Sequence, residues 1–155
     1  MASINTSICN SFLGELLNAE HDLNSHTIKL ALIKNGYSGD YNDETTSYNT
    51  LTSNSDEATG SNYSAGGATV TVNALTTSNT GNRAFIDIDD VVFSNVTTSA
   101  DGCIIYNAST AGSTNKAIAV FAFGSTISAT SGDLTVTMPA PGSEGANAII
   151  RIANS

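Results

Sequence analysis

The sequence predicts a mainly β protein: an antiparallel β-sandwich or jelly-roll-like barrel with one N-terminal amphipathic helix. Ser, Thr and Asn fill 57 of the 155 positions, and these short hydroxyl and amide side chains favour turns and strands over helix interiors. Charged residues make up only 12%, about half of the ~25% usual in soluble domains. The length is that of one domain, which we expect to span residues 1–155.

Helical periodicity is confined to the start of the chain. Apolar residues recur there at steps of three to five positions: Ile4, Ile8, Phe12 or Leu13, Leu16 and Leu17. This spacing predicts an amphipathic helix with Asn5 or Thr6 as its N-cap and an end near Asn18. The helix and a polar connector occupy residues 1–26, and alternating apolar residues over 28–32 predict the first strand.

Residues 35–67 are polar, rich in glycine and without periodicity, which predicts a long loop. Its tyrosines, Tyr37, Tyr41, Tyr48 and Tyr63, are the expected anchors of the loop on the body of the domain. A short strand is expected around 47–51.

The second half of the chain consists of short apolar segments separated by turn residues. Strands are predicted at 68–75, 83–87, 91–93, 102–106, 117–123, 134–138 and 148–152. Turn chemistry separates them at 79–82, 99–102, 111–115, 131–133 and 139–142. The nearly continuous apolar run at 118–123 indicates a strand covered on both faces, either by the N-terminal helix or by another subunit.

The charge balance excludes several classes of partner. The formal net charge is −9, with 14 acidic and 5 basic residues. Phosphate binding needs clustered lysine and arginine, so we expect no nucleic-acid partner and no anionic membrane surface. No apolar run is long enough to cross a bilayer, and no basic residue precedes the first apolar stretch as in a secretory signal.

The sequence offers few residues for catalysis or for binding a cofactor. His21 and His26 lack a third well-placed ligand, so we interpret them as part of a polar connector. Asp87, Asp89 and Asp90 form the densest acidic cluster, which we interpret as a solvated sheet rim rather than a calcium site. We therefore expect that the protein is not an enzyme and that it binds no cofactor and no metal ion.

Cys9 and Cys103 are too far apart in sequence for a disulfide framework or a zinc site. We interpret both as small buried apolar residues.

The order of motifs resembles a family of small virion structural proteins of tailed bacteriophages. The resemblance covers nearly the whole chain and is carried by "NYSAGGATVTV", "AFIDIDDVVFSNVTTSADGCIIYN", "KAIAVFAFG" and "SGDLTVTMPAPG". The positions that match the family pattern have structural roles in it: Tyr63, Gly66, Gly67, Asp90, Val91, Phe93, Tyr106, Asn107, Phe123 and Gly124.

The resemblance implies a capsid decoration, or cement, protein. Such a protein is made in the cytoplasm of the bacterial host and binds the outer surface of the major capsid protein of the virion, commonly as a homotrimer. An alternative from the same group is a tail, baseplate or head-fibre protein that takes part in attachment to the host surface. The absence of tryptophan weakens the glycan recognition that this alternative would use.

Overall fold

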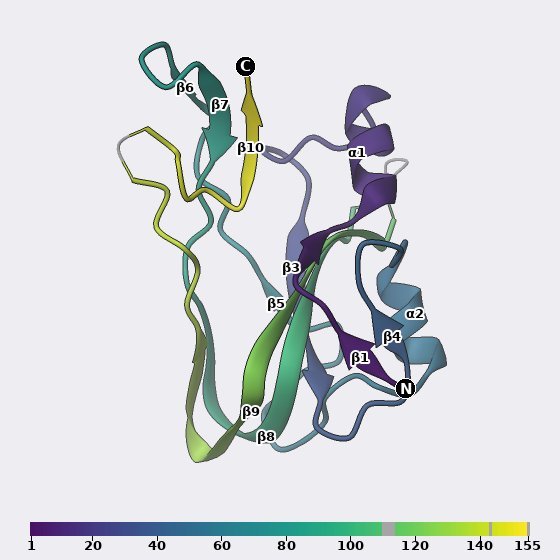
Figure 1. Cartoon of the computed structure of the whole chain (residues 1–155). Helices are drawn as coiled ribbons and strands as arrows, with labels where there is room; N and C mark the ends of the chain where they lie inside the picture. The colour runs from purple at the N-terminus through teal and green to yellow at the C-terminus, as the bar shows by residue number, and fades with distance from the viewer. Residues whose placement is uncertain (110–113, 143, 155) are drawn as a thin grey trace.

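The largest sheet is built on two long strands, β8 (Val91–Asn107) and β9 (Lys116–Val136), which pair antiparallel along their length. The computed structural model describes residues 1–109, 114–142 and 144–154 (Figure 1). The sheet has the order β2-β9-β8-β3-β5. Its other strands are β2 (Ser7–Ile8), β3 (Ile28–Lys34) and β5 (Ala68–Thr69).

Strands β8 and β9 bend together, so that the ribbon they form has two arms joined at the lower end of the view in Figure 1. The ladder shifts register between Phe93 and Val96 and again between Ala100 and Gly102. The predictions of separate strands at 91–93 and 102–106, and at 117–123 and 134–138, are therefore wrong. Bulges in the ladder absorb the residues that were predicted to form turns at 99–102 and 131–133. Part of the turn predicted at 111–115 lies outside the described residues.

Two smaller sheets complete the β structure. β6 (Thr76–Ser78), β7 (Arg83–Ile86) and β10 (Ile150–Ala153) form an antiparallel sheet in the order β10-β7-β6. The strand predicted at 83–87 is confirmed, and that at 148–152 begins two residues later. The strand predicted at 68–75 is wrong beyond Thr69, because the chain leaves one sheet there and enters the other. β1 (Ser3–Ile4) and β4 (Asp40–Tyr41) pair parallel.

The helices differ from the sequence prediction. α1 (Asn10–Leu17) begins after β1 and β2, so Ile4 and Ile8 lie on strands, and Cys9 takes the N-cap position expected at Asn5 or Thr6. The strand expected at 47–51 is wrong, since α2 (Tyr48–Ser53) occupies that segment. The Ser47 hydroxyl caps α2 by accepting a hydrogen bond from the backbone N–H of Asn49 at 3.1 Å.

The mainly β, antiparallel prediction is confirmed, but the sheets of the described residues do not close into a barrel. The core lies on α1, on β3, and on the part of the ribbon in which residues 102–107 of β8 pair with residues 116–122 of β9. Its fully buried side chains include Phe12, Leu30, Leu32, Ile104, Ile105, Ile118 and Val120. Cys9 and Cys103 are free and buried, as expected.

The long loop is held against β3 by its tyrosines. Tyr41 is fully buried, and the Tyr63 hydroxyl accepts a hydrogen bond from the backbone N–H of Leu32 at 3.0 Å. The Tyr48 ring stacks on Tyr106 of β8 with 4.4 Å between ring centroids. The segment therefore packs as part of the domain.

Candidate functional site

Three of the motif residues, Tyr63, Gly66 and Tyr106, meet near the carboxylate of Glu57. Glu57 Oε1 accepts hydrogen bonds from the Tyr63 hydroxyl at 3.1 Å and from the Gly66 N–H at 2.6 Å, and its Oε2 accepts one from the Tyr48 hydroxyl at 2.6 Å. The Tyr106 hydroxyl donates to the carbonyl of Gly66 at 2.8 Å. Burial, and then the charge of Glu57, raise the pKa of Tyr106 to about 12, so this phenol stays a donor. The cluster fastens the loop to the sheet.

Gly67 and Phe93 complete this structural cluster. Gly67 has φ +71°, and a Cβ atom there would lie 1.8 Å from the carbonyl oxygen of Leu30. Only glycine allows the two backbones to approach so closely. The Phe93 ring is buried, 5.5 Å from the Tyr63 ring centroid.

Asn107 joins the two histidines of the connector. Its side-chain amide donates to Nδ1 of His21 at 3.1 Å and to Nδ1 of His26 at 2.8 Å. His21 therefore carries its proton on Nε2 and donates it to Glu15 at 2.9 Å. Glu15 also pairs with Lys116 at 3.3 Å. The two histidines belong to a hydrogen-bond network that links α1 to the sheet.

The acidic cluster is satisfied by protein donors. The amide of Asn73, which the sequence reading did not single out, donates to Asp87 at 3.0 Å and to Asp89 at 2.9 Å. Asp90 accepts a hydrogen bond from the backbone N–H of Met138 at 2.7 Å. Within the described ranges, no three His, Cys, Asp or Glu side chains are placed to hold a metal ion.

The last motif pair, Phe123 and Gly124, lies on an open strand edge. β2 pairs with β9 only at Ala119 and Val120, and the Ala122 N–H donates to the Thr6 hydroxyl at 3.0 Å. In the part of the chain that the structure describes, no strand pairs with this side of β9 farther along. No charged residue occurs between Lys116 and Asp133. This stretch is an uncharged edge, which natural sheets usually avoid.

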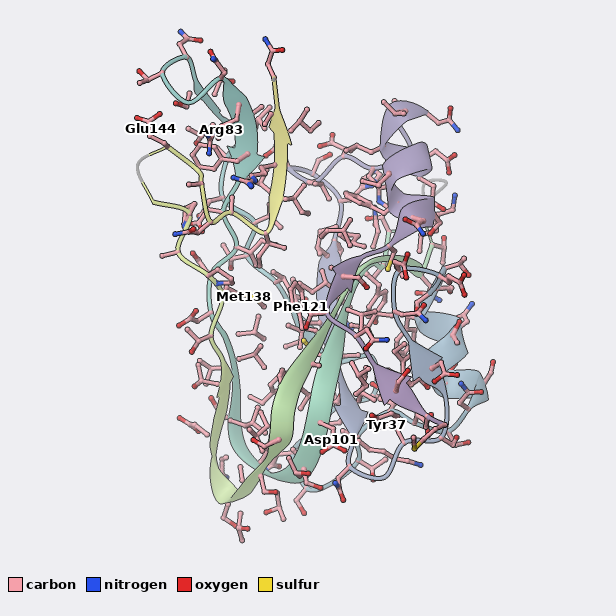
Figure 2. All side chains as sticks on the ribbon, viewed as in Figure 1. Tyr37, Arg83, Asp101, Phe121, Met138 and Glu144 are labelled. Carbon is pink, nitrogen blue, oxygen red and sulfur yellow. The ribbon has the colours of Figure 1, made fainter. Side chains whose placement is uncertain are left out.

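An apolar groove lies beside this edge, between the two arms of β9: the central arm, which begins at Lys116, and the outer arm, which ends at Val136. Phe121 and Phe123 line one side of it, and Val136 and Met138 line the other, with Ile127 near the bend. Figure 2 shows Phe121 on the central arm and Met138 beyond the end of the outer arm. The groove has a volume of about 380 Å³, and its two phenylalanines are only half-buried. The sequence signal for it was the apolar run at 118–123.

The opposite face of the same segment is different in character. Ala122 and Gly124 lie two residues apart and border a small polar pocket with Asp101 and Thr126 of the bend. Gly124 has φ +77°, a conformation that favours glycine, and its missing side chain leaves the rim of the pocket open.

Comparison with protein-family models, curated proteins and solved structures finds no match to this chain. Within the described residues, no helix is long and apolar enough to cross a membrane. The candidate site is therefore defined by geometry: an open edge of β9 with an apolar groove on one face and a polar pocket on the other.

Proposed function

We propose that the protein is a capsid decoration protein of a tailed phage, which binds the outer surface of the major capsid protein as a homotrimer and stabilises the head. The observation that carries the proposal is the uncharged, unpaired edge of β9 beside the apolar groove. The motif order of the sequence supplies the virion context.

The edge has the features of a protein-binding surface. Exposed sheet edges are commonly blocked by charges or proline because unpaired N–H and C=O groups attract other strands. β9 has neither along 117–132. The groove adds apolar area that a partner can cover at about 25 cal/mol per Å². Ser125, Thr126 and Ser128 of the same strand are exposed, and polar residues commonly surround the apolar centre of an interface.

The charge of the chain suits a place on the outside of a capsid. At a net charge of −9, the protein is repelled by packaged nucleic acid and attracted to basic surfaces. Closed cyclic symmetry in a trimer would bury two complementary patches of each subunit, one against each neighbour. The rest of the surface of each subunit would remain available for the capsid.

The function is tested by locating the protein on purified virions. Heads and tails are separated, and the copy number of the chain in each is measured by quantitative mass spectrometry. We expect hundreds of copies on the head, comparable with the capsid protein itself. A few copies confined to the tail would overturn the proposal in favour of host-surface attachment.

The surface is tested by binding the recombinant chain to capsids that lack it. Phe123→Asp places a charge in the groove, whereas Leu13→Asp makes the same kind of change on α1, where Leu13 is 51% exposed. We expect Phe123→Asp to weaken co-sedimentation at least about tenfold, with Leu13→Asp close to wild type. Wild-type binding by a folded Phe123→Asp variant would refute this surface. Sedimentation equilibrium tests the trimer.

A further inference from the structure

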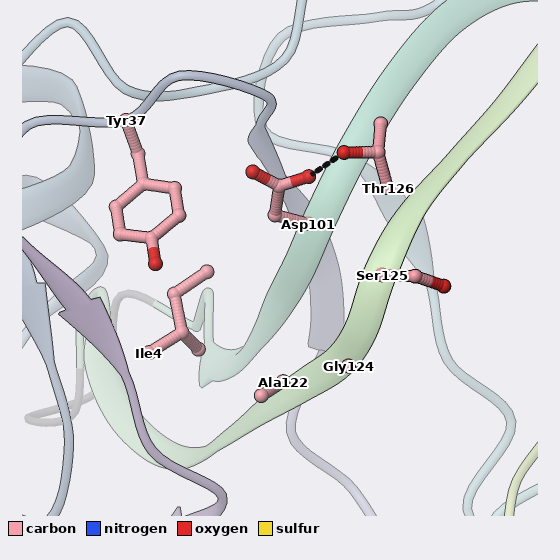
Figure 3. Close-up of a pocket in the computed structure, with 7 residues that line it drawn as sticks. All are labelled: Ile4, Tyr37, Asp101, Ala122, Gly124, Ser125 and Thr126. Atoms are coloured by element: carbon pink, nitrogen blue, oxygen red, sulfur yellow. Dashed lines mark hydrogen bonds between the residues drawn. The ribbon is translucent and has the colours of Figure 1, made fainter.

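The polar pocket at the bend of β8 and β9 has the composition of a binding site. It is lined by Ile4, Tyr37, Asp101, Ala122, Gly124, Ser125 and Thr126 and has a volume of about 300 Å³, at the lower end of the range for small-ligand pockets. Figure 3 shows the Tyr37 ring and the Asp101 carboxylate on opposite sides of it, with Ile4 and Ala122 beneath. These residues come from β1, β8, β9 and the start of the long loop, so the fold assembles the pocket from distant segments.

Asp101 is held in a fixed orientation. Its Oδ1 accepts a hydrogen bond from the Thr126 hydroxyl at 2.5 Å and one from the Asn35 amide at 3.2 Å. The Asn35 amide also donates to Thr126 at 2.8 Å, which closes a ring of hydrogen bonds. The other oxygen, Oδ2, accepts only a long bond from Asn35 at 3.3 Å. A carboxylate oxygen has two lone pairs, so Oδ2 can still accept a strong donor.

The charge of Asp101 has no counter-charge in the described residues. None of their ion pairs includes Asp101. Lys34 is opposite Ala100 in the ladder, but its ammonium pairs with Asp56 at 3.4 Å. The whole chain has only five basic residues against 14 acidic ones. The net negative charge of the chain therefore attracts a cation toward this pocket at long range, and the Asp101 carboxylate attracts it at contact.

The remaining walls suit the stem of an amphipathic side chain. Ile4, Ala122 and the half-buried ring of Tyr37 are apolar surfaces. Lysine and arginine bury their methylene stems on such surfaces while the charged end reaches a polar partner. An aromatic ring close to the cation adds a cation–π attraction. A neutral sugar would also meet a ring and a carboxylate, but it would leave the Asp101 charge uncompensated.

We infer that this pocket receives a lysine or arginine side chain of the protein's binding partner, with the cationic end on Asp101 Oδ2 and the stem between Tyr37 and Ile4. The inference deepens the proposed function, since it assigns basic chemistry to the partner surface that the β9 edge contacts. It makes Asp101 the anchor on one face of the edge, opposite the apolar groove.

The test is a titration of the full-length chain with small probes, followed by ¹⁵N–¹H NMR. The probes are Nα-acetyl-lysine N-methylamide, its arginine counterpart and its uncharged norleucine counterpart. We expect saturable shifts of the Asp101, Gly124 and Thr126 amides with the two cations and none with norleucine. Binding should weaken as salt is raised, because the contact is ionic.

Variants identify the anchor. Asp101→Asn should weaken lysine binding at least about tenfold, the effect of losing one charge-assisted hydrogen bond, and Tyr37→Ala should weaken it less. Glu44→Gln removes one negative charge from an exposed residue outside the pocket and should leave binding unchanged.

Three results would overturn the assignment. Equal binding of norleucine would make the pocket merely apolar, and binding of methyl glucoside without lysine would make it a sugar site. The absence of shifts at these amides with every probe would remove the site altogether. The titration uses the isolated chain, so its outcome is independent of where the virion carries the protein.

Discussion

Asp56 is the buried charge on which the packing of the long loop depends, and its removal should be costly. The residue is 0% exposed. Its carboxylate accepts hydrogen bonds from the Tyr41 hydroxyl and the Gly39 N–H, both at 2.8 Å, and from the Ser38 N–H at 2.9 Å. Lys34 supplies the counter-charge at 3.4 Å. Asp56→Asn keeps the shape but turns one accepting oxygen into an NH₂ group that faces donors.

The magnitude follows from these contacts. Removing one partner of a buried ion pair costs about 3–5 kcal/mol. The Lys34 side chain is 36% exposed, so water screens part of its attraction to Asp56. We therefore expect Asp56→Asn to lower the free energy of unfolding by about 3 kcal/mol, the lower end of that range. The measurement is urea unfolding at neutral pH followed by circular dichroism. Glu44→Gln, an exposed acid, serves as the control and should change the free energy of unfolding by less than about 0.5 kcal/mol.

The pH dependence gives a second readout of the same carboxylate. Burial alone would raise the pKa of Asp56, but the hydrogen bonds from Tyr41, Ser38 and Gly39 and the contact with Lys34 together lower it below the ordinary value of 3.8. Asp56 therefore binds a proton more readily in the unfolded chain than in the folded protein. The stabilisation is present above the ordinary pKa and is lost as the pH falls through the lower, folded value.

The wild type should therefore lose more unfolding free energy than Asp56→Asn between about pH 6 and about pH 3. Equal losses would refute the reasoning, as would a folded variant destabilised by less than about 1 kcal/mol at neutral pH.

Two further predictions concern other parts of the core. Gly67→Ala should cost at least about 2 kcal/mol more than Gly36→Ala in urea unfolding, because both have positive φ but only at Gly67 would a Cβ meet a backbone oxygen, that of Leu30; equal costs would contradict the close approach. Burial raises the pKa of the Cys9 thiol to about 12 and raises that of Cys103 as well. Both thiols should stay unreactive toward a thiol-specific disulfide reagent at about pH 8 until the chain is unfolded, and rapid labelling of the native protein would contradict their burial.

The strand content was predictable because it depends on local pattern. Apolar alternation marks β3, and short apolar segments gave the starts of β8 and β9. The lengths of the last two strands were not predictable from local chemistry. Gly124 and Ser131 both have positive φ, a backbone conformation that is typical of turns, yet they lie inside one continuous strand. Only the pairing with β8 decides whether the chain turns at these residues or continues as a strand.

The acids that organise the loop were missed for a related reason. Sequence reasoning concentrated on Asp87, Asp89 and Asp90, which are neighbours in the chain. Asp56 and Glu57 gather their partners from distant positions. The tyrosines were a usable signal, because a phenol that becomes buried needs an acceptor for its hydroxyl proton.

The prediction of a strand covered on both faces holds for part of β9 and fails where the candidate site begins. Ala119 and Val120, which point to opposite faces of the strand, are both 0% exposed. Phe121 and Phe123 are only partly buried, and β2 does not continue along this part of the edge, because its first residue, Ser7, is opposite Val120. The groove and the pocket then lie on opposite faces of one edge. A partner segment that adds to this edge would reach both at once, as in strand addition. The effects of Phe123→Asp and Asp101→Asn on partner binding should then be non-additive, since loss of either contact would loosen the shared strand.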